Sequence, residues 1–140
     1  MAHDLERFVE AQDDVWSDVE RELRAGQKTS HWMWFVFPQL AGLGSSEMAR
    51  RYAIADRAEA DAYLDHPVLG PRLRDAAGWL LSHADRSAEE VLGGVDAQKL
   101  RSCATLFSHR PGSPDWARQI LEAFFNGEAD PVTLERLGQH

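Results

Sequence analysis

Apolar residues recur at steps of three and four along most of the chain, which is the spacing of one face of an α-helix. The first such run predicts a single helix over residues 4–25. Its apolar stripe follows Leu5, Phe8, Val9, Gln12, Trp16, Val19 and Leu23. Gly26 is expected to end this helix, because glycine readily adopts the left-handed conformation that closes many helices.

The remaining periodic runs predict further helices, and most of them begin at a residue that can cap a helix N-terminus. In the first half of the chain we expect a helix from Ser45 or Ser46 through residue 54, one over 58–64 after Asp56, and one over 68–84 after His66–Pro67, with a break at Gly70–Pro71. Ser87 and Glu90 should form a capping box before a helix over 88–92, and Asp96 should be the N-cap of a helix that runs to about 108. The last two helices are expected over 115–125 after Ser113–Pro114, and from Asp130–Pro131 to about 137. We therefore expect one all-α domain over residues 1–140, with roughly seven or eight helices.

The segment His31–Gln39 departs from this pattern, because six consecutive residues, Trp32 to Phe37, are apolar. Ser30 can cap a short helix here, and Pro38 is expected to end it. A buried strand is the alternative, but the chain offers no second strand with which it could pair. Consecutive helical residues lie about 100° apart, so these side chains point in all directions. Either the segment is enclosed on every side, or one of its faces lines a pocket.

The hydrophobic content and the charge of the chain limit the kinds of fold and partner that we expect. The chain has 140 residues, of which 44% are hydrophobic, so it can bury a sizeable core. Its net charge is −8, and residues 1–22 carry −6 of this, from eight acids and two arginines. That acidic segment is either a solvated helix face or a docking surface for a basic partner. We expect no nucleic-acid partner, because lysine and arginine do not cluster.

Three further features indicate a cytoplasmic protein. No stretch approaches the roughly 18 apolar residues that span a bilayer, so we expect no membrane partner. The first six residues are acidic and lead no hydrophobic region, unlike a secretory signal. Cys103 is the one cysteine, which fits a reducing compartment. Neither composition nor pattern indicates the oligomeric state.

The aromatic run offers the first candidate binding residues. Trp32 and Trp34 can stack on a flat ligand, and Gln39 at the end of the run can add polar recognition. His31 is the candidate acid or base if the site is catalytic, because histidine titrates near neutral pH. Hydrolysis of a glycosidic bond is compatible with such a residue, although no motif demonstrates it.

Two other stretches add polar candidates. Ser45 lies in a glycine loop, Gly42–Ser46, that enters a helix N-terminus, where free amides favour phosphate; a tight turn with a cap is the alternative. Lys99 is a candidate for binding an anionic small molecule. Ser102 lies three residues further on, and it either joins the site or satisfies a backbone carbonyl within its helix. The histidines lack metal-ligand spacing, so we expect no metal and no cofactor.

Motifs along the whole chain resemble those of one protein family. They are Leu5–Phe8, Gly26–Lys28, Ser30–Phe35, Phe37–Gln39, Gly42–Gly44, Ala62–Leu64, His66–Gly70, Lys99–Leu100 and Thr105–Phe107. This chain resembles the uncharacterised bacterial and fungal family DUF1810, also called the Rv1873-like family. The resemblance implies an all-α orthogonal helical fold and no established activity.

Two functions from different classes remain open. The first is binding of a small molecule, of nucleotide or nucleotide-sugar type, at a site that is hydrolytic if His31 acts in it. It requires a concave pocket that joins Trp32 or Trp34 to His31, Gln39 or Lys99. The second is a non-enzymatic protein-interaction module that uses the acidic helix or exposed aromatic residues. It requires an exposed apolar patch of several hundred Å².

Overall fold

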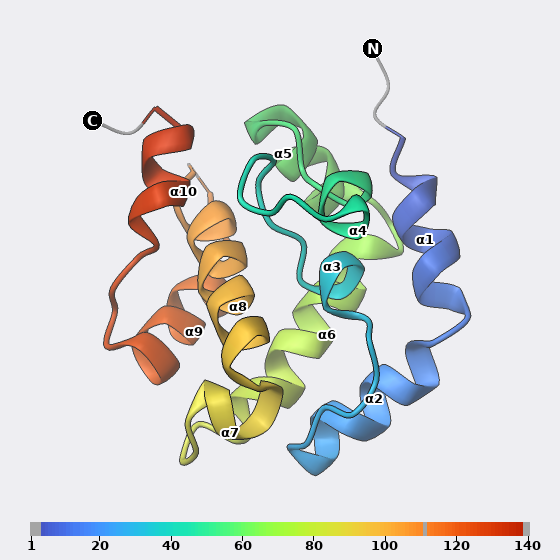
Figure 1. Cartoon of the computed structure of the whole chain (residues 1–140), viewed down its shortest axis with the longest axis vertical. Coiled ribbons are helices and arrows are strands. Elements are labelled where there is room, and N and C mark those ends of the chain that lie inside the picture. The colour runs from blue at the N-terminus through green and yellow to red at the C-terminus, as the bar shows by residue number, and fades with distance from the viewer. Residues whose placement is uncertain (1–3, 111, 139–140) are drawn as a thin grey trace.

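The computed structural model describes residues 4–110 and 112–138, and these residues form ten α-helices (Figure 1). The helices are α1 (Glu6–Asp13), α2 (Trp16–Ala25), α3 (Met33–Val36), α4 (Glu47–Arg51), α5 (Arg57–Asp65), α6 (Leu69–Leu81), α7 (Ala88–Leu92), α8 (Gly94–Ser108), α9 (Asp115–Phe125) and α10 (Pro131–Arg136). Leu40 and Ile54 make one isolated parallel bridge, and the described chain has no strand. The all-α prediction is therefore confirmed. The first three residues of the acidic N-terminus and Pro111 lie outside the described residues.

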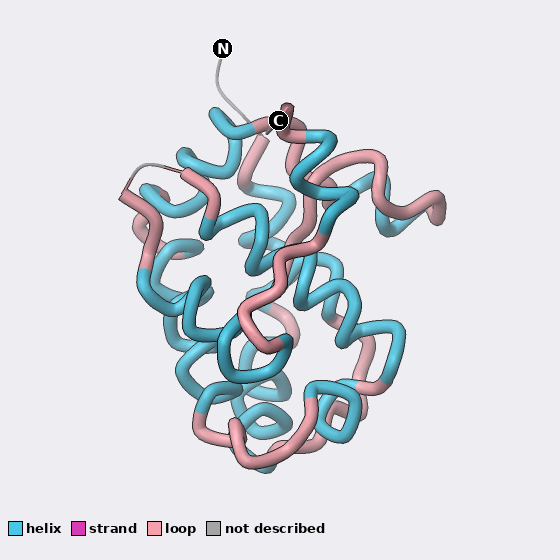
Figure 2. Tube along the Cα trace, turned by 90° about the vertical axis from the view of Figure 1, so that its left-hand side faces the viewer, coloured by secondary structure: helices cyan, strands magenta, loops and turns pink. Residues whose placement is uncertain are grey.

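The two longest helices, α6 and α8, organise the core. Helix α6 packs against α2, α5 and α9, while α8 packs against α5, α7, α9 and α10. Figure 2 shows the helices running in several directions, as expected of an orthogonal fold. No described helix has both the length and the apolar character needed to cross a membrane.

The prediction of one helix over residues 4–25 is wrong, because the chain turns between α1 and α2. Asp14 and Val15 form the turn, in which the Val15 amide donates to the Gln12 carbonyl (3.0 Å). The buried Gln12 side chain donates to the Phe35 carbonyl (2.6 Å) and to the Tyr63 hydroxyl (3.1 Å). The apolar spacing resumes in phase after the turn, so periodicity alone does not reveal it.

The aromatic run forms a short helix as expected, but Ser30 does not cap it. Helix α3 begins after Trp32, which provides no side-chain cap, and the Ser30 hydroxyl donates to a Glu22 carboxylate oxygen instead (2.7 Å). The apolar residues of the run are buried except for Trp34, which is half-buried. The segment is thus largely enclosed, and Trp34 is the side chain that reaches its open side.

Most predicted caps are correct, but Asp96, like Ser30, is not a cap. The side chains that accept a bond from the backbone at a helix start are Ser46, Asp56, Ser87 and Asp130, with Ser87 and Glu90 forming the capping box. Asp96 is not an N-cap, because Gly93 precedes α8 and Asp96 lies within its first turn. Its carboxylate contacts two lysines instead of the helix backbone.

The predicted break at Gly70–Pro71 is absent, because both residues lie in the first turn of α6, where proline is tolerated. A Cβ on Gly70 would collide with the Leu64 backbone carbonyl at the end of α5. Glycine at position 70 therefore allows α5 and α6 to approach closely.

Substitution of the two α6 glycines is expected to have opposite effects on stability. Gly70→Ala should lower the free energy of unfolding by about 1–3 kcal/mol, since the added methyl overpacks the contact with Leu64. Gly78 is exposed, and a methyl group added to it would meet nothing within 4 Å, so Gly78→Ala should raise stability by about 0.5–1 kcal/mol. Urea unfolding of both variants measures the difference. Destabilisation of equal size by both would contradict the close-contact explanation.

Candidate functional site

A cavity of about 600 Å³ lies between the loop before α4, α3 and the facing sides of α8 and α10. We call it the Trp34 cavity. Its lining residues are Trp34, Gln39, Gly42, Leu43, Gly44, Ser45, Ser46, Ala49, Val95, Gln98, Lys99, Ser102, Asp130 and Val132. The structure thus brings together five of the seven candidate site residues, from α3, the loop before α4 and α8. Trp32 and His31 are the two that do not line it.

Lys99 and Trp34 lie next to each other in this cavity. The Lys99 ammonium is 4.8 Å from the centroid of the Trp34 ring, within the range of a cation–π contact. The same ammonium lies 3.5 Å from Asp96 Oδ1, which is long for a charge-assisted hydrogen bond. Lys99 is 20% exposed, so its charge is accessible from the cavity.

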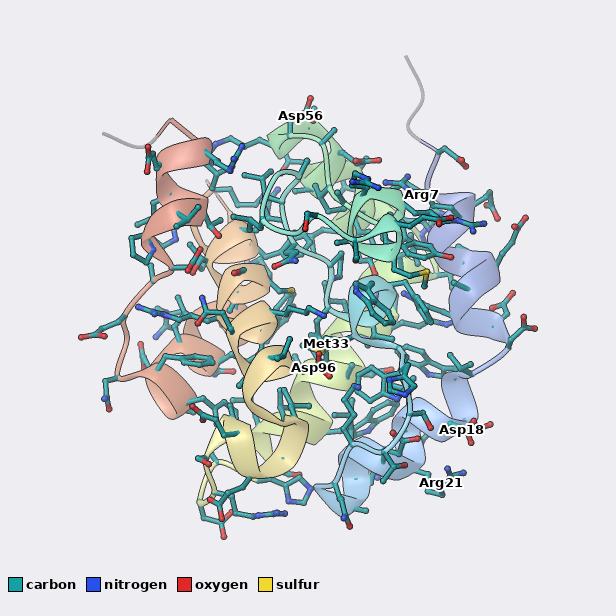
Figure 3. All side chains as sticks on the ribbon, viewed as in Figure 1. Arg7, Asp18, Arg21, Met33, Asp56 and Asp96 are labelled. Carbon is teal, nitrogen blue, oxygen red and sulfur yellow. The ribbon has the colours of Figure 1, made fainter. Side chains whose placement is uncertain are left out.

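Asp96 also contacts a second lysine, Lys28, from the loop after α2. The Lys28 ammonium is 2.7 Å from Asp96 Oδ2 and donates to the Ser30 carbonyl (2.6 Å). It lies 5.0 Å from the centroid of the Trp32 ring. Asp96 extends from α8 toward the centre of the view in Figure 3. Two lysines, each beside a tryptophan of the aromatic run, therefore share one carboxylate.

The wall opposite Trp34 is formed by polar side chains that already have partners. Asp130 is buried, and its carboxylate accepts from the Gln98 amide (3.0 Å), the Thr133 backbone amide (2.9 Å) and the Thr133 hydroxyl (2.6 Å). The Ser102 hydroxyl donates to the Gln98 carbonyl (3.2 Å). This bond to a backbone carbonyl of its own helix is one of the two alternatives that the sequence indicates for Ser102. These hydrogen bonds restrain the Gln98, Ser102 and Asp130 side chains.

Two exposed valines line the Trp34 cavity beside its polar residues. Val95 in the first turn of α8 is 74% exposed, and Val132 in the first turn of α10 is 49% exposed. They are the exposed large apolar residues of the described chain. Sequence reasoning missed both, together with Gln98 and Asp130, because a single exposed valine or a helix cap carries no signal of a site until the tertiary structure places it.

Trp32 belongs to the core. Its ring is fully buried, and its indole N–H donates to Glu22 Oε1 (3.1 Å). The same carboxylate accepts from the Thr29 amide (2.8 Å), the Ser30 amide (2.9 Å) and the Ser30 hydroxyl (2.7 Å). Burial raises the pKa of Glu22, but these hydrogen bonds outweigh it and lower the pKa from 4.5 to about 2. Glu22 therefore anchors the loop that carries Lys28 and leads into the aromatic run.

His31 is exposed on the outer side of this loop, and the structure does not bring it to the Trp34 cavity. Ser45, in contrast, lies at the cavity edge, on the loop that precedes α4. A Cβ on Gly44 in that loop would lie 2.7 Å from the Ala49 Cβ, so the loop packs closely on α4. The cavity thus contains one of the two stacking candidates, Trp34, and the polar candidates, but not the candidate acid or base.

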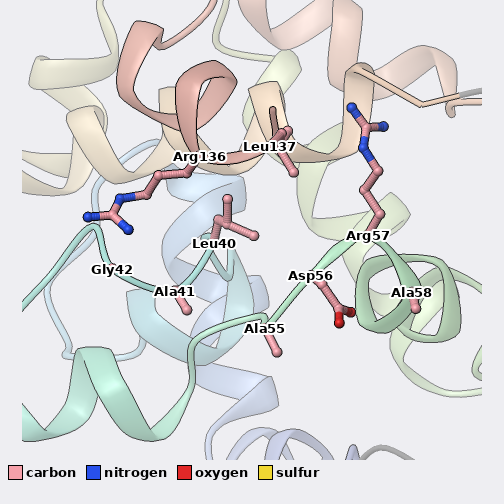
Figure 4. Close-up of a pocket in the computed structure, with 9 residues that line it drawn as sticks. All are labelled: Leu40, Ala41, Gly42, Ala55, Asp56, Arg57, Ala58, Arg136 and Leu137. Carbon is pink, nitrogen blue, oxygen red and sulfur yellow. The ribbon is translucent and has the colours of Figure 1, made fainter. Parts of the chain in front are cut away.

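A second cavity of about 780 Å³ lies beside the first and shares Gly42 with it (Figure 4). Its two arginines do not converge. The Arg136 guanidinium reaches over Gly42, whereas the Arg57 guanidinium points away and donates to the His109 carbonyl. The start of α5 at this cavity is capped by its own carboxylate, Asp56. Arg136 is thus the guanidinium that the larger cavity would present to an anion, and it stands without a second converging cation.

The matches to known proteins include all the residues that line the Trp34 cavity. A family model described as "Protein of unknown function (DUF1810)" matches residues 2–137. Among solved structures, the chain is similar to the crystal structure of the conserved hypothetical protein Rv1873 from Mycobacterium tuberculosis, with 46% sequence identity and a TM-score of 0.94. That likeness covers 98% of this chain and 98% of the other. No curated protein matches the chain. Neither matching description names a ligand or a reaction.

Proposed function

Because the chain belongs to the DUF1810 family, whose function is unknown, its activity has to be inferred from the site, and we propose that it binds a small anionic molecule with a planar ring. The ligand is of nucleotide or nucleotide-sugar type and occupies the Trp34 cavity. The observation that carries this proposal is the position of the Lys99 ammonium, 4.8 Å from the Trp34 ring and facing a cavity of about 600 Å³.

The size and lining of the Trp34 cavity support a small-molecule ligand. Its volume falls within the range of about 300–1,000 Å³ that is usual for ligand pockets. Apolar side chains such as Leu43 and Val132 can cover a ring or sugar, and Gln39 and Ser45 can donate hydrogen bonds to it.

The charge of the lining supports an anionic ligand. Lys99 is the one cationic residue among the described residues that line the Trp34 cavity. Asp130 is the one carboxylate there, and it already accepts three hydrogen bonds. An incoming phosphate or carboxylate would thus meet an accessible ammonium and a carboxylate that other groups already satisfy.

We propose that the Trp34 cavity binds its ligand without hydrolysing it. His31, the candidate acid or base, is exposed outside the cavity. Hydrolysis would need a proton donor or acceptor within hydrogen-bond reach of the ligand. Lys99 and the hydroxyl of Ser45 are suited to holding an anion, so recognition is the function that the lining supports best.

Calorimetric titration with nucleotides tests the proposal. AMP, UMP, GMP and UDP-glucose are screened by thermal shift, and the tightest binder is titrated. Trp34→Ala should weaken its binding by about 1–3 kcal/mol, the usual value of base stacking on an aromatic side chain. Lys99→Met should cause a loss of about tenfold or more for the charged ligand.

The matched control for Trp34 is Trp79, another half-buried tryptophan with a cation near its ring, the Arg24 guanidinium at 5.2 Å. Trp79 does not line the Trp34 cavity, so Trp79→Ala should leave nucleotide affinity unchanged. Absence of binding across the panel, or an equal loss in the Trp34 and Trp79 variants, would contradict the proposed function.

A further inference from the structure

The chain contains only two lysines among its 15 basic Lys and Arg residues, and both contact the same carboxylate. Lys28 is 2.7 Å from Asp96 Oδ2, a normal charge-assisted hydrogen bond, whereas Lys99 is 3.5 Å from Asp96 Oδ1. The Lys28 side chain is 7% exposed, and it does not line the Trp34 cavity. Asp96 is therefore held mainly by the buried lysine, and only weakly by the lysine that faces the cavity.

This arrangement contributes a positive charge beside the cavity. Two ammonium groups and one carboxylate give the cluster Lys28–Asp96–Lys99 a net charge of +1. Without Lys28, Asp96 and Lys99 would neutralise each other. Asp96 is 17% exposed, so its field reaches Lys99 with less screening than a surface charge would have.

Lys28 also determines the free-energy cost of moving the Lys99 ammonium away from Asp96 and toward a ligand. If Lys99 were the sole partner of Asp96, its movement would leave a partly buried carboxylate unpaired, which is unfavourable. With Lys28 in place, Asp96 keeps its shorter ion pair while Lys99 contacts the ligand. The Lys99 ammonium already divides its contacts between Asp96 Oδ1 and the Trp34 ring, so no strong bond has to break.

We infer that Lys28 is a positioning residue that determines the preference of the Trp34 cavity for anions, acting through Asp96 without touching the ligand. The inference rests on the proposed function and adds a specificity determinant to it. The position of Lys28 is itself well defined, because its backbone amide donates to the Val91 carbonyl (2.9 Å) and its ammonium donates to the Ser30 carbonyl (2.6 Å).

A double-mutant cycle with charged and neutral probes tests this inference. AMP is the anionic probe, adenosine is the neutral probe with the same ring, and inorganic pyrophosphate is an anion without a ring. Lys28→Met should weaken AMP binding about tenfold and leave adenosine binding unchanged. Asp96→Asn should strengthen AMP binding several-fold. The double variant has the net charge of the native cluster, so it should bind AMP within about threefold of wild type.

The ratio of AMP affinity to adenosine affinity separates this role from a structural one. Lys28→Arg keeps the charge and should keep the ratio, and Asp96→Asn tests the same cluster if the Lys28→Met variant fails to fold. Equal weakening of AMP and adenosine by Lys28→Met would overturn the inference, as would failure of Asp96→Asn to restore AMP binding.

The same titrations distinguish failure of this inference from failure of the proposed function. Wild-type protein that binds pyrophosphate but neither AMP nor adenosine would contradict a ring-stacking ligand, and the cycle would then be measured with pyrophosphate. Binding of none of the three probes would overturn both proposals. AMP binding that does not respond to Lys28 or Asp96 would overturn the inference alone.

Discussion

Replacement of Glu22 by alanine is expected to lower the free energy of unfolding by about 4 kcal/mol, because several buried donors lose their acceptor at once. The Glu22 carboxylate is 3% exposed and accepts from the amides of Thr29 and Ser30, the Ser30 hydroxyl and the Trp32 indole. An unsatisfied buried donor costs about 1–3 kcal/mol, and water entering the space left by the side chain can satisfy only part of this set.

Chemical denaturation measures this effect, and Glu20→Ala is the matched control. Glu20 lies in the same helix and pairs with Arg24 at 2.7 Å, but the pair is exposed. Its loss should cost less than about 0.5 kcal/mol. If Glu22→Ala were as mild as Glu20→Ala, the carboxylate could not be the anchor of the loop that carries Lys28 and Trp32.

The stability that Glu22 provides should disappear in acid. Its pKa is lowered from 4.5 to about 2 in the folded protein, so the folded state favours the ionised carboxylate. This contribution is fully present above the unfolded pKa and is lost as the pH falls toward the folded one. A shift of this size corresponds to about 3 kcal/mol in total.

Wild type and Glu22→Gln should therefore converge in stability as the pH is lowered. The difference in unfolding free energy between them should shrink by about 2 kcal/mol between about pH 6 and about pH 3, and by about 3 kcal/mol near pH 2. Subtraction of the two curves cancels the other carboxylates, which both proteins share. Parallel stability curves over this range would show that Glu22 ionises at its ordinary pKa.

Local sequence signals predicted the helices well where a side chain bonds to its own helix. Asp56, Ser87 and Asp130 lie at helix starts, and each accepts from the backbone amide three residues ahead, as its position indicates. Such bonds depend on a few consecutive residues, so spacing along the chain is sufficient to find them. The same reasoning failed at Asp96, whose partners Lys28 and Lys99 include one from a distant loop.

The aromatic run shows where prediction of the site reached its limit. Trp32 and Trp34 are equivalent as candidates in the sequence, yet Trp32 donates to buried Glu22 and Trp34 lines the cavity. Which of the two tryptophans lines the cavity depends on the neighbour that each side chain meets, and these neighbours come from α2 and α8. Lys99 was a candidate from its charge alone, and only the fold places it beside Trp34.

One measurement tests the central claim most directly, namely that the Trp34 cavity binds a planar anionic ligand. The protein has five tryptophans, so each indole N–H gives its own signal in a ¹H–¹⁵N NMR spectrum of labelled protein. Titration with the tightest nucleotide of the panel should shift the Trp34 indole and the amides of residues 42–46 and Lys99. The buried Trp32 indole and the remote Trp79 indole should move little. Shifts centred on Arg57 and Arg136 instead, or no shift at saturating nucleotide, would contradict the claim.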